Sequence, residues 1–119
     1  MGGYLTSHVL DLVAGKPAAR VHIELWRLDP ANGANTLLAS AWTNADGRTD
    51  APLLEGSDFI VGRYELVFDV GAYFAGQGIE AATPFLDKVP IHFGVANADA
   101  HYHVPLLVSP WAYSTYRGS

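Results

Sequence analysis

Residues 20–28 read RVHIELWRL, a stretch that alternates between apolar and polar side chains. Val21, Ile23 and Leu25 share one face of an extended chain, and the residues between them occupy the other face. Successive side chains of a β-strand point to opposite sides of its sheet, so this period of two indicates a strand with one buried face. The same alternation returns in RYELVFDV at residues 63–70 and in PIHFGV at residues 90–95.

Turn signals separate these stretches, and their spacing predicts an all-β fold. They are Gly15-Lys16-Pro17, Asp29-Pro30, Asn32-Gly33, Asp46-Gly47 and Gly56-Ser57. Short alternating strands between such turns favour a two-sheet antiparallel β-sandwich, here with about seven or eight strands. Residues 70–78, VGAYFAGQG, break the alternation, and we predict one short helix there.

The length and composition narrow the class of protein. A chain of 119 residues is long enough to bury a core, and we expect one domain over residues 1–119. It has no cysteine, which excludes disulfides and thiolate metal sites. The first residues, MGGYLTSHVLDLV, lack the features of a signal peptide, and no apolar run reaches membrane-spanning length. We therefore expect a cytoplasmic protein with no membrane partner.

The charge balance points away from nucleic acid and towards self-association. Seven Lys and Arg against twelve Asp and Glu give a net charge of -5, which disfavours nucleic acid and anionic membranes as partners. Charged residues make up 16% of the chain, whereas roughly 25% is usual for a soluble domain. A surface so poor in charge predicts that part of it is covered by other copies of the chain.

The stretch HYHVPLLVS, residues 101–109, is apolar on both faces of the strand that it predicts. Tyr102, Val104, Leu106 and Val108 suit the core. The opposite face carries two histidines, a proline and a leucine, and it would also be covered. Since the sequence predicts so little helix, another subunit is the best candidate for this second cover.

Three interpretations of His101 and His103 are open. The two residues lie on the same face of the predicted strand, with side chains roughly 6–7 Å apart. They could bind a metal with a third ligand such as His8. They could act in acid–base chemistry, because imidazole titrates near neutral pH. They could also be partly buried polar residues at an interface.

Other candidate residues are weaker when taken singly. His8 points outward among apolar neighbours of the first strand, which again fits a covered surface. His22 and His92 occupy solvent-facing positions. Arg48, after a turn, and Arg117 have the ordinary interpretation of exposed arginines. The sequence has no glycine-rich phosphate loop, serine nucleophile elbow or Glu-x-x-His motif. These patterns alone do not define a reaction.

Three stretches together resemble the transthyretin-related 5-hydroxyisourate hydrolases. They are LTSHVLDLVAGKPAARVHIELWRL near the start, TNADGRTDAPLL in the middle and HYHVPLLVSPWAYSTYRGS at the end. The resemblance covers essentially the whole chain in the same order. It implies a transthyretin-like sandwich with no cofactor. The closing YRGS, residues 116–119, separates these enzymes from transthyretin, the thyroid-hormone carrier with the same fold.

The resemblance also implies a set of site residues at a subunit interface of a homotetramer, a dimer of dimers. The implied catalytic residues are His8, Arg48, His103 and Ser119. Substrate binding is implied for His8, Arg48, Tyr116, Arg117 and Gly118, and no metal site is implied. His101 faces the same side and is the weaker candidate, as a supporting or interface residue.

The implied reaction is the hydrolytic opening of 5-hydroxyisourate to 2-oxo-4-hydroxy-4-carboxy-5-ureidoimidazoline in urate degradation. Water adds to the carbonyl carbon C6, and the bond from C6 to N1 breaks. His8 or His103 would take the proton of water, Arg48 would hold the oxyanion, and Tyr116 would help to orient the ring. The alternative is a non-catalytic, transthyretin-like carrier of small aromatic ligands. A purely structural sandwich is a more distant third.

Overall fold

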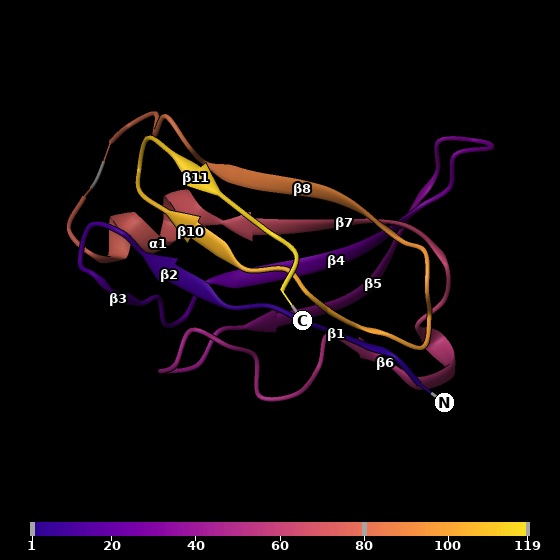
Figure 1. The fold of residues 1–119 in the computed structure, drawn as a ribbon. Coiled ribbons are helices and arrows are strands. Elements are labelled where there is room, and N and C mark those ends of the chain that lie inside the picture. Colours follow the sequence, from indigo (N-terminus) through magenta and orange to yellow (C-terminus); the bar gives the residue numbers. More distant parts are fainter. Residues whose placement is uncertain (1, 80, 119) are drawn as a thin grey trace.

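The computed structural model describes residues 2–79 and 81–118. Among these residues it contains eleven strands, one α-helix and one short 3-10 helix, η1 (Figure 1). In chain order the elements are β1 (Tyr4–Thr6), β2 (Val9–Asp11), β3 (Lys16–Pro17), β4 (His22–Leu28), β5 (Asn35–Trp42), β6 (Leu54–Glu55), η1 (Gly56–Asp58), β7 (Gly62–Asp69), α1 (Val70–Gly76), β8 (Lys88–Val95), β9 (His101–His103), β10 (Leu106–Val108) and β11 (Tyr113–Ser114).

The strands form two layers, as expected for a sandwich. One layer is the antiparallel sheet β5-β4-β7-β8, built from the longest strands. The other layer combines the two short sheets β6-β1-β9 and β11-β10-β2-β3, which follow one another because β1 continues into β2 and β9 continues towards β10 (Figure 1). The predicted strands over residues 20–28, 63–70 and 90–95 are confirmed as β4, β7 and β8.

Two details of the second layer differ from the sequence prediction. The stretch 101–109 forms two strands, β9 and β10, separated by Val104 and Pro105. The N–H groups on either side of Pro105 still donate to the first strands, Val104 to Thr6 and Leu106 to His8. The pairs β1–β9 and β2–β10 are parallel, so the two ends of the chain run side by side within an otherwise antiparallel fold.

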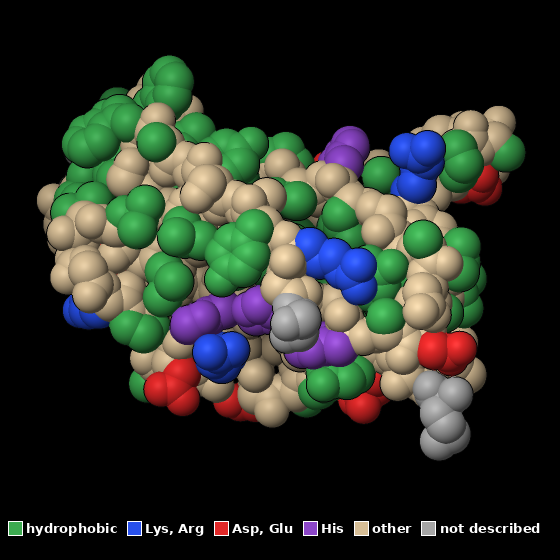
Figure 2. Space-filling model, in the orientation of Figure 1, with side chains coloured by type: hydrophobic (Ala, Val, Ile, Leu, Met, Phe, Trp, Pro, Cys, Tyr) green, Lys and Arg blue, Asp and Glu red, His purple; other side chains and the backbone are tan. Residues whose placement is uncertain are grey.

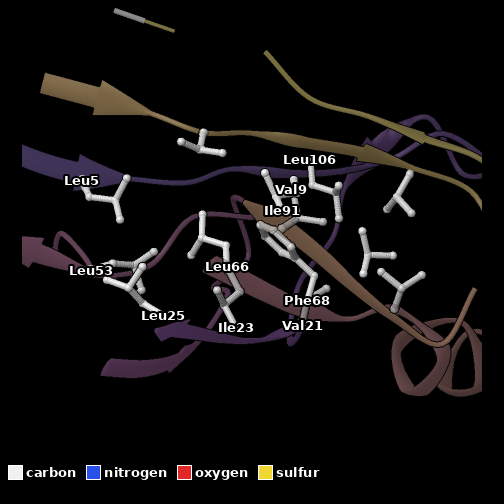
Figure 3. Close-up of a cluster of buried hydrophobic side chains, with 14 of the residues drawn as sticks. Leu5, Val9, Val21, Ile23, Leu25, Leu53, Leu66, Phe68, Ile91 and Leu106 are labelled. Carbon is white, nitrogen blue, oxygen red and sulfur yellow. The ribbon is translucent and has the colours of Figure 1, made fainter. Parts of the chain in front are cut away.

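The core lies between the two layers (Figure 3). The buried side chains come from the faces that the alternation predicts. They are Val21, just before β4, Ile23 and Leu25 on β4, and Tyr64, Leu66 and Phe68 on β7. Leu5 and Val9 close the core from the second layer, and both are fully buried. Burial of this kind stabilises the fold by roughly 25 cal/mol for each Å² of apolar surface removed from water. It also holds the opposite face of β1 and β2 towards the outside.

The helix α1 covers one end of the sandwich (Figure 1). Asp69 caps its N-terminus by accepting a hydrogen bond from the N–H of Ala72, and Val70, Tyr73 and Phe74 are buried on one side. The prediction of a short helix at residues 70–78 is therefore confirmed, although the helix ends two residues earlier, at Gly76. In the part of the chain that the structure describes, no helix combines the length and apolarity required to cross a membrane.

A buried carboxylate joins α1 to the second layer. Asp11 is 2% exposed, and its Oδ1 accepts hydrogen bonds from the N–H groups of Val13 and Ala14. The Tyr73 hydroxyl donates to Oδ2 over 2.7 Å. Burial and the neighbouring carboxylate raise the pKa of Tyr73, so the phenol remains protonated and remains a donor.

Removing this phenol is expected to destabilise the fold. The substitution Tyr73→Phe should lower the free energy of unfolding by about 1–3 kcal/mol, because a buried carboxylate oxygen loses its donor. Urea denaturation measures the difference. Tyr113→Phe, at an exposed tyrosine of β11, is the matched control and should change stability little. Equal stability of the Tyr73→Phe variant and the wild type would contradict this role of the hydroxyl.

Candidate active site

A tight loop places Arg48 beside His8. The N–H of Asn44 donates to the carbonyl of Arg48 over 2.7 Å, which closes the turn that contains Asp46 and Gly47. Arg48 then forms an isolated antiparallel bridge with His8, in the gap between β1 and β2. Gly47 has a φ of 77°, and a Cβ there would lie 2.5 Å from the carbonyl oxygen of Val9, so the close approach requires glycine.

The ring of His8 is held by the same turn. Its Nε2 lies 2.8 Å from the carbonyl oxygen of Asp46. A carbonyl only accepts hydrogen bonds, so Nε2 carries the hydrogen in this contact and Nδ1 of the neutral ring carries the lone pair. The bridge and this hydrogen bond together place an imidazole and a guanidinium next to each other on the surface.

The parallel pairing of β1 with β9 builds the second part of the site. The register sets Tyr4 beside His101 and Thr6 beside His103. The rings of Tyr4 and His101 are stacked, with centroids 4.1 Å apart and planes 10° from parallel. The Thr6 hydroxyl lies between the two imidazoles, 2.7 Å from Nε2 of His101 and 2.8 Å from Nδ1 of His103.

These two parts border one open cavity of about 500 Å³. Figure 2 shows histidine side chains gathered on this face of the molecule, with basic side chains next to them. The cavity is lined by Tyr4, Thr6, Ser7, Arg48, Thr49, Asp50, Ala51, Pro52, His101 and His103. The walls carry imidazole, guanidinium and hydroxyl groups, which can hold a small polar molecule and move a proton on it.

The environment of His103 favours the neutral imidazole. Burial lowers its pKa below the ordinary value of 6.5, and electrostatic interaction with Arg48, and then with His101 and His8, lowers it further. A neutral imidazole at pH 7 can accept a proton from water. Arg48 lines the same cavity as His103, and His8 pairs with Arg48, so residues from three distant segments lie in this region.

The end of the chain lies against His103. The N–H of Gly118 donates to the carbonyl of His103 over 2.8 Å, and the two residues form an isolated antiparallel bridge. A Cβ at position 118 would lie 2.7 Å from Cδ2 of the His103 ring, so only glycine allows the chain to pass this closely. The segment is therefore part of the wall around the histidine rather than a free tail.

Tyr116 and Arg117 occupy a different hollow. The Arg117 guanidinium lies over the ring of Tyr102, 4.0 Å from its centroid, in a cation–π contact. Both residues line a cavity of about 200 Å³ between the last segment and β8, and neither lines the histidine cavity. Ser119, a catalytic residue implied by the family resemblance, lies outside the described residues.

The structure thus brings together His8, Arg48, His103 and Gly118 from the predicted set. It adds Thr6, which the sequence analysis did not single out, although the alternation places Thr6 on the same face as His8. In residues 2–79 and 81–118, no group of three or more His, Cys, Asp or Glu side chains is arranged to hold a metal ion.

Two layers of strands with a histidine-lined cavity on the outer face of one of them define a transthyretin-like β-sandwich protein. The sequence profile of the HIUase/Transthyretin family matches residues 5–118. The chain belongs to this family.

The relatives and solved structures agree with this assignment. The chain is 60% identical over 119 residues to a 5-hydroxyisourate hydrolase of Mesorhizobium japonicum, covering 99% of this chain and 94% of that protein. The structure of the Klebsiella pneumoniae 5-hydroxyisourate hydrolase has a TM-score of 0.80 and 36% identity, and the match covers 98% of this chain and 99% of that one. A crystal structure of (S)-allantoin synthase has a TM-score of 0.92 and 50% identity, covering 99% of this chain but 44% of that longer chain.

Proposed function

We propose that this protein hydrolyses 5-hydroxyisourate to 2-oxo-4-hydroxy-4-carboxy-5-ureidoimidazoline, a step of urate degradation. The observation that carries the proposal is that Arg48 and His103, from distant segments, line one cavity, and that His8 pairs with Arg48 next to it. The relative that is 60% identical bears the name of this activity and matches over 99% of the chain, which favours the hydrolase over a carrier.

In the proposed mechanism His103 is the general base. Its neutral imidazole takes a proton from a water molecule as the water oxygen adds to C6 of the substrate. The bond from C6 to N1 then breaks, and the proton on His103 is available for the departing nitrogen. General-base assistance of this kind contributes about 10²–10⁴-fold in rate. The lowered pKa of His103 supports this assignment, because the neutral ring is then the main form at pH 7.

Arg48 and His8 complete the proposed site. The Arg48 guanidinium lines the cavity and would hold the oxygen that becomes negative when water adds to C6. His8, with Nε2 on the carbonyl of Asp46, would orient the substrate ring. We retain Ser119, which follows Gly118 in the sequence, as a proposed catalytic residue. Tyr116, Arg117 and Gly118 remain proposed substrate-binding residues, although Tyr116 and Arg117 line the smaller cavity beside β8.

The assembly belongs to the same proposal. We propose that residues 1–119 act as one domain and associate into a homotetramer, a dimer of dimers, with the cavity at an interface. Leu107 of β10 is half-buried and lies on the outer face of the layer, and Trp111 is 67% exposed, so apolar surface remains for other copies. Sedimentation equilibrium should give four times the chain mass of 12.8 kDa. A monomer at micromolar concentration would contradict the assembly.

The activity is tested by generating 5-hydroxyisourate with urate oxidase and following its ultraviolet decay with and without this protein. The proposal expects decay well above the spontaneous rate, and unchanged decay in EDTA. No acceleration, together with saturable binding of small aromatic compounds, would favour the carrier. Walls that carry imidazole and guanidinium groups are poorly suited to apolar ligands, which is why the hydrolase is preferred.

The acid side of the pH profile should reflect His103. Activity requires the neutral imidazole, and burial together with the charge of Arg48 lowers the pKa of His103 below 6.5. The rate should therefore stay high as the pH falls to 6.5 and decline only below that value. Measuring kcat/KM from pH 5 to pH 8 checks the prediction. A midpoint above 6.5 would contradict the assignment of His103 as the base.

A further inference from the structure

The hydroxyl of Thr6 occupies a position that the proposed mechanism does not use. It lies 2.7 Å from Nε2 of His101 and 2.8 Å from Nδ1 of His103, both within hydrogen-bond range. The parallel register of β1 and β9 enforces this placement, because it pairs Thr6 directly with His103. The two rings themselves are 6.1 Å apart between centroids, so the hydroxyl is the link between them.

A hydroxyl group has one hydrogen to donate, and this limits the possible arrangements. If Thr6 donates to His101, it accepts from Nδ1–H of His103, and Nε2 of His103 keeps its lone pair. If Thr6 donates to His103, then Nε2 of His103 carries the hydrogen and cannot act as a base. The directions of these two hydrogen bonds therefore decide whether Nε2 of His103 has a lone pair that can accept a proton.

The charge of Arg48 favours the first arrangement. Arg48 lines the same cavity as His103 and lowers the pKa of that ring. A guanidinium offers only N–H donors, so it favours a lone pair over a second N–H on the ring nitrogen that faces away from Thr6. His101, for its part, is held by stacking on Tyr4, which keeps its Nε2 directed at the Thr6 hydroxyl.

We propose that Thr6 is a positioning residue that accepts Nδ1–H of His103 and donates to Nε2 of His101, which leaves Nε2 of His103 as the base. The inference rests on the proposed hydrolase function for its catalytic consequence. When water adds to the substrate, its proton goes to Nε2 of His103 while Nδ1 keeps its hydrogen on the Thr6 oxygen. The imidazolium that forms is thereby held by a hydrogen bond to a neutral acceptor.

Kinetics with two variants at position 6 test the catalytic consequence. Thr6→Val keeps the shape but removes the hydroxyl, and it should lower kcat by about 10–100-fold with KM changed by less than about threefold, since the base loses its preferred tautomer. Thr6→Ser restores the hydroxyl and should restore kcat. Thr36→Val on β5, at an exposed position away from the site, is the matched control. Equal kcat for Thr6→Val and the wild type would overturn the proposal.

Nitrogen-15 NMR tests the tautomer without substrate or turnover. Two-bond proton–nitrogen spectra of the wild type at pH 7.5 should show His103 with hydrogen on Nδ1 and none on Nε2, and its signals are identified by their loss in His103→Asn. A His103 ring with hydrogen on Nε2 would overturn the proposal. The spectra could show the predicted tautomer although the protein does not act on 5-hydroxyisourate. That result would support the role of Thr6 in positioning His103 and refute only the proposed function.

Discussion

The substitution His103→Asn is expected to lower kcat by about 10²–10⁴-fold, the range that general-base catalysis contributes. Asn retains a polar group near the position of Nδ1, so the contact with Thr6 can persist while the accepting nitrogen is lost. The carbonyl of His103, which binds the N–H of Gly118, is unaffected because it belongs to the backbone. Steady-state kinetics on generated 5-hydroxyisourate measure the loss.

The matched control for this variant is His92→Asn. His92 is an exposed histidine of β8 that contacts Glu65 and does not line the histidine cavity. Its substitution should leave kcat within about twofold of the wild type, as expected for a surface position. Circular dichroism and sedimentation should match the wild type for both variants. A His103→Asn enzyme with wild-type kcat would remove His103 from the mechanism.

The second large effect is expected for Arg48→Met, which keeps an unbranched side chain but removes the guanidinium. The loss of a group that stabilises a developing oxyanion costs about 10²–10³-fold in kcat. If Arg48 also holds the ground state of the substrate, KM should rise in addition. Arg63→Met is the control, since Arg63 is an exposed arginine of β7 outside the cavity. Retention of more than half of the wild-type kcat/KM in Arg48→Met would contradict the role.

The Arg48→Met enzyme should also have a shifted pH profile. The charge of Arg48 disfavours the imidazolium form of His103 and so lowers its pKa. Removing this charge raises the pKa of His103, and the acid limb of kcat/KM should move to higher pH. The Arg63→Met control should keep the wild-type limb. This shift separates loss of an electrostatic neighbour from a general disturbance of the fold, which would lower the rate without moving the limb.

Much of the fold could be predicted from local patterns. The alternation in residues 20–28 identified both a strand and its buried face, because the pleat repeats every two residues. At residues 70–78 this alternation stops, and that loss of the strand period indicated the helix. The division of residues 101–109 into two strands was not predicted, because the alternation of buried side chains continues through Val104 and Leu106 without a break.

The sequence by itself determined the chemical groups of this protein, the faces on which they lie and the family to which it belongs. The tertiary structure alone decided which groups meet. Thr6 and His103 are joined by a parallel pairing, and His8 reaches Arg48 through a turn about forty residues away. Such contacts depend on which strands become neighbours across the molecule. The side-chain period within one strand fixes which face is buried but does not name the neighbouring strand.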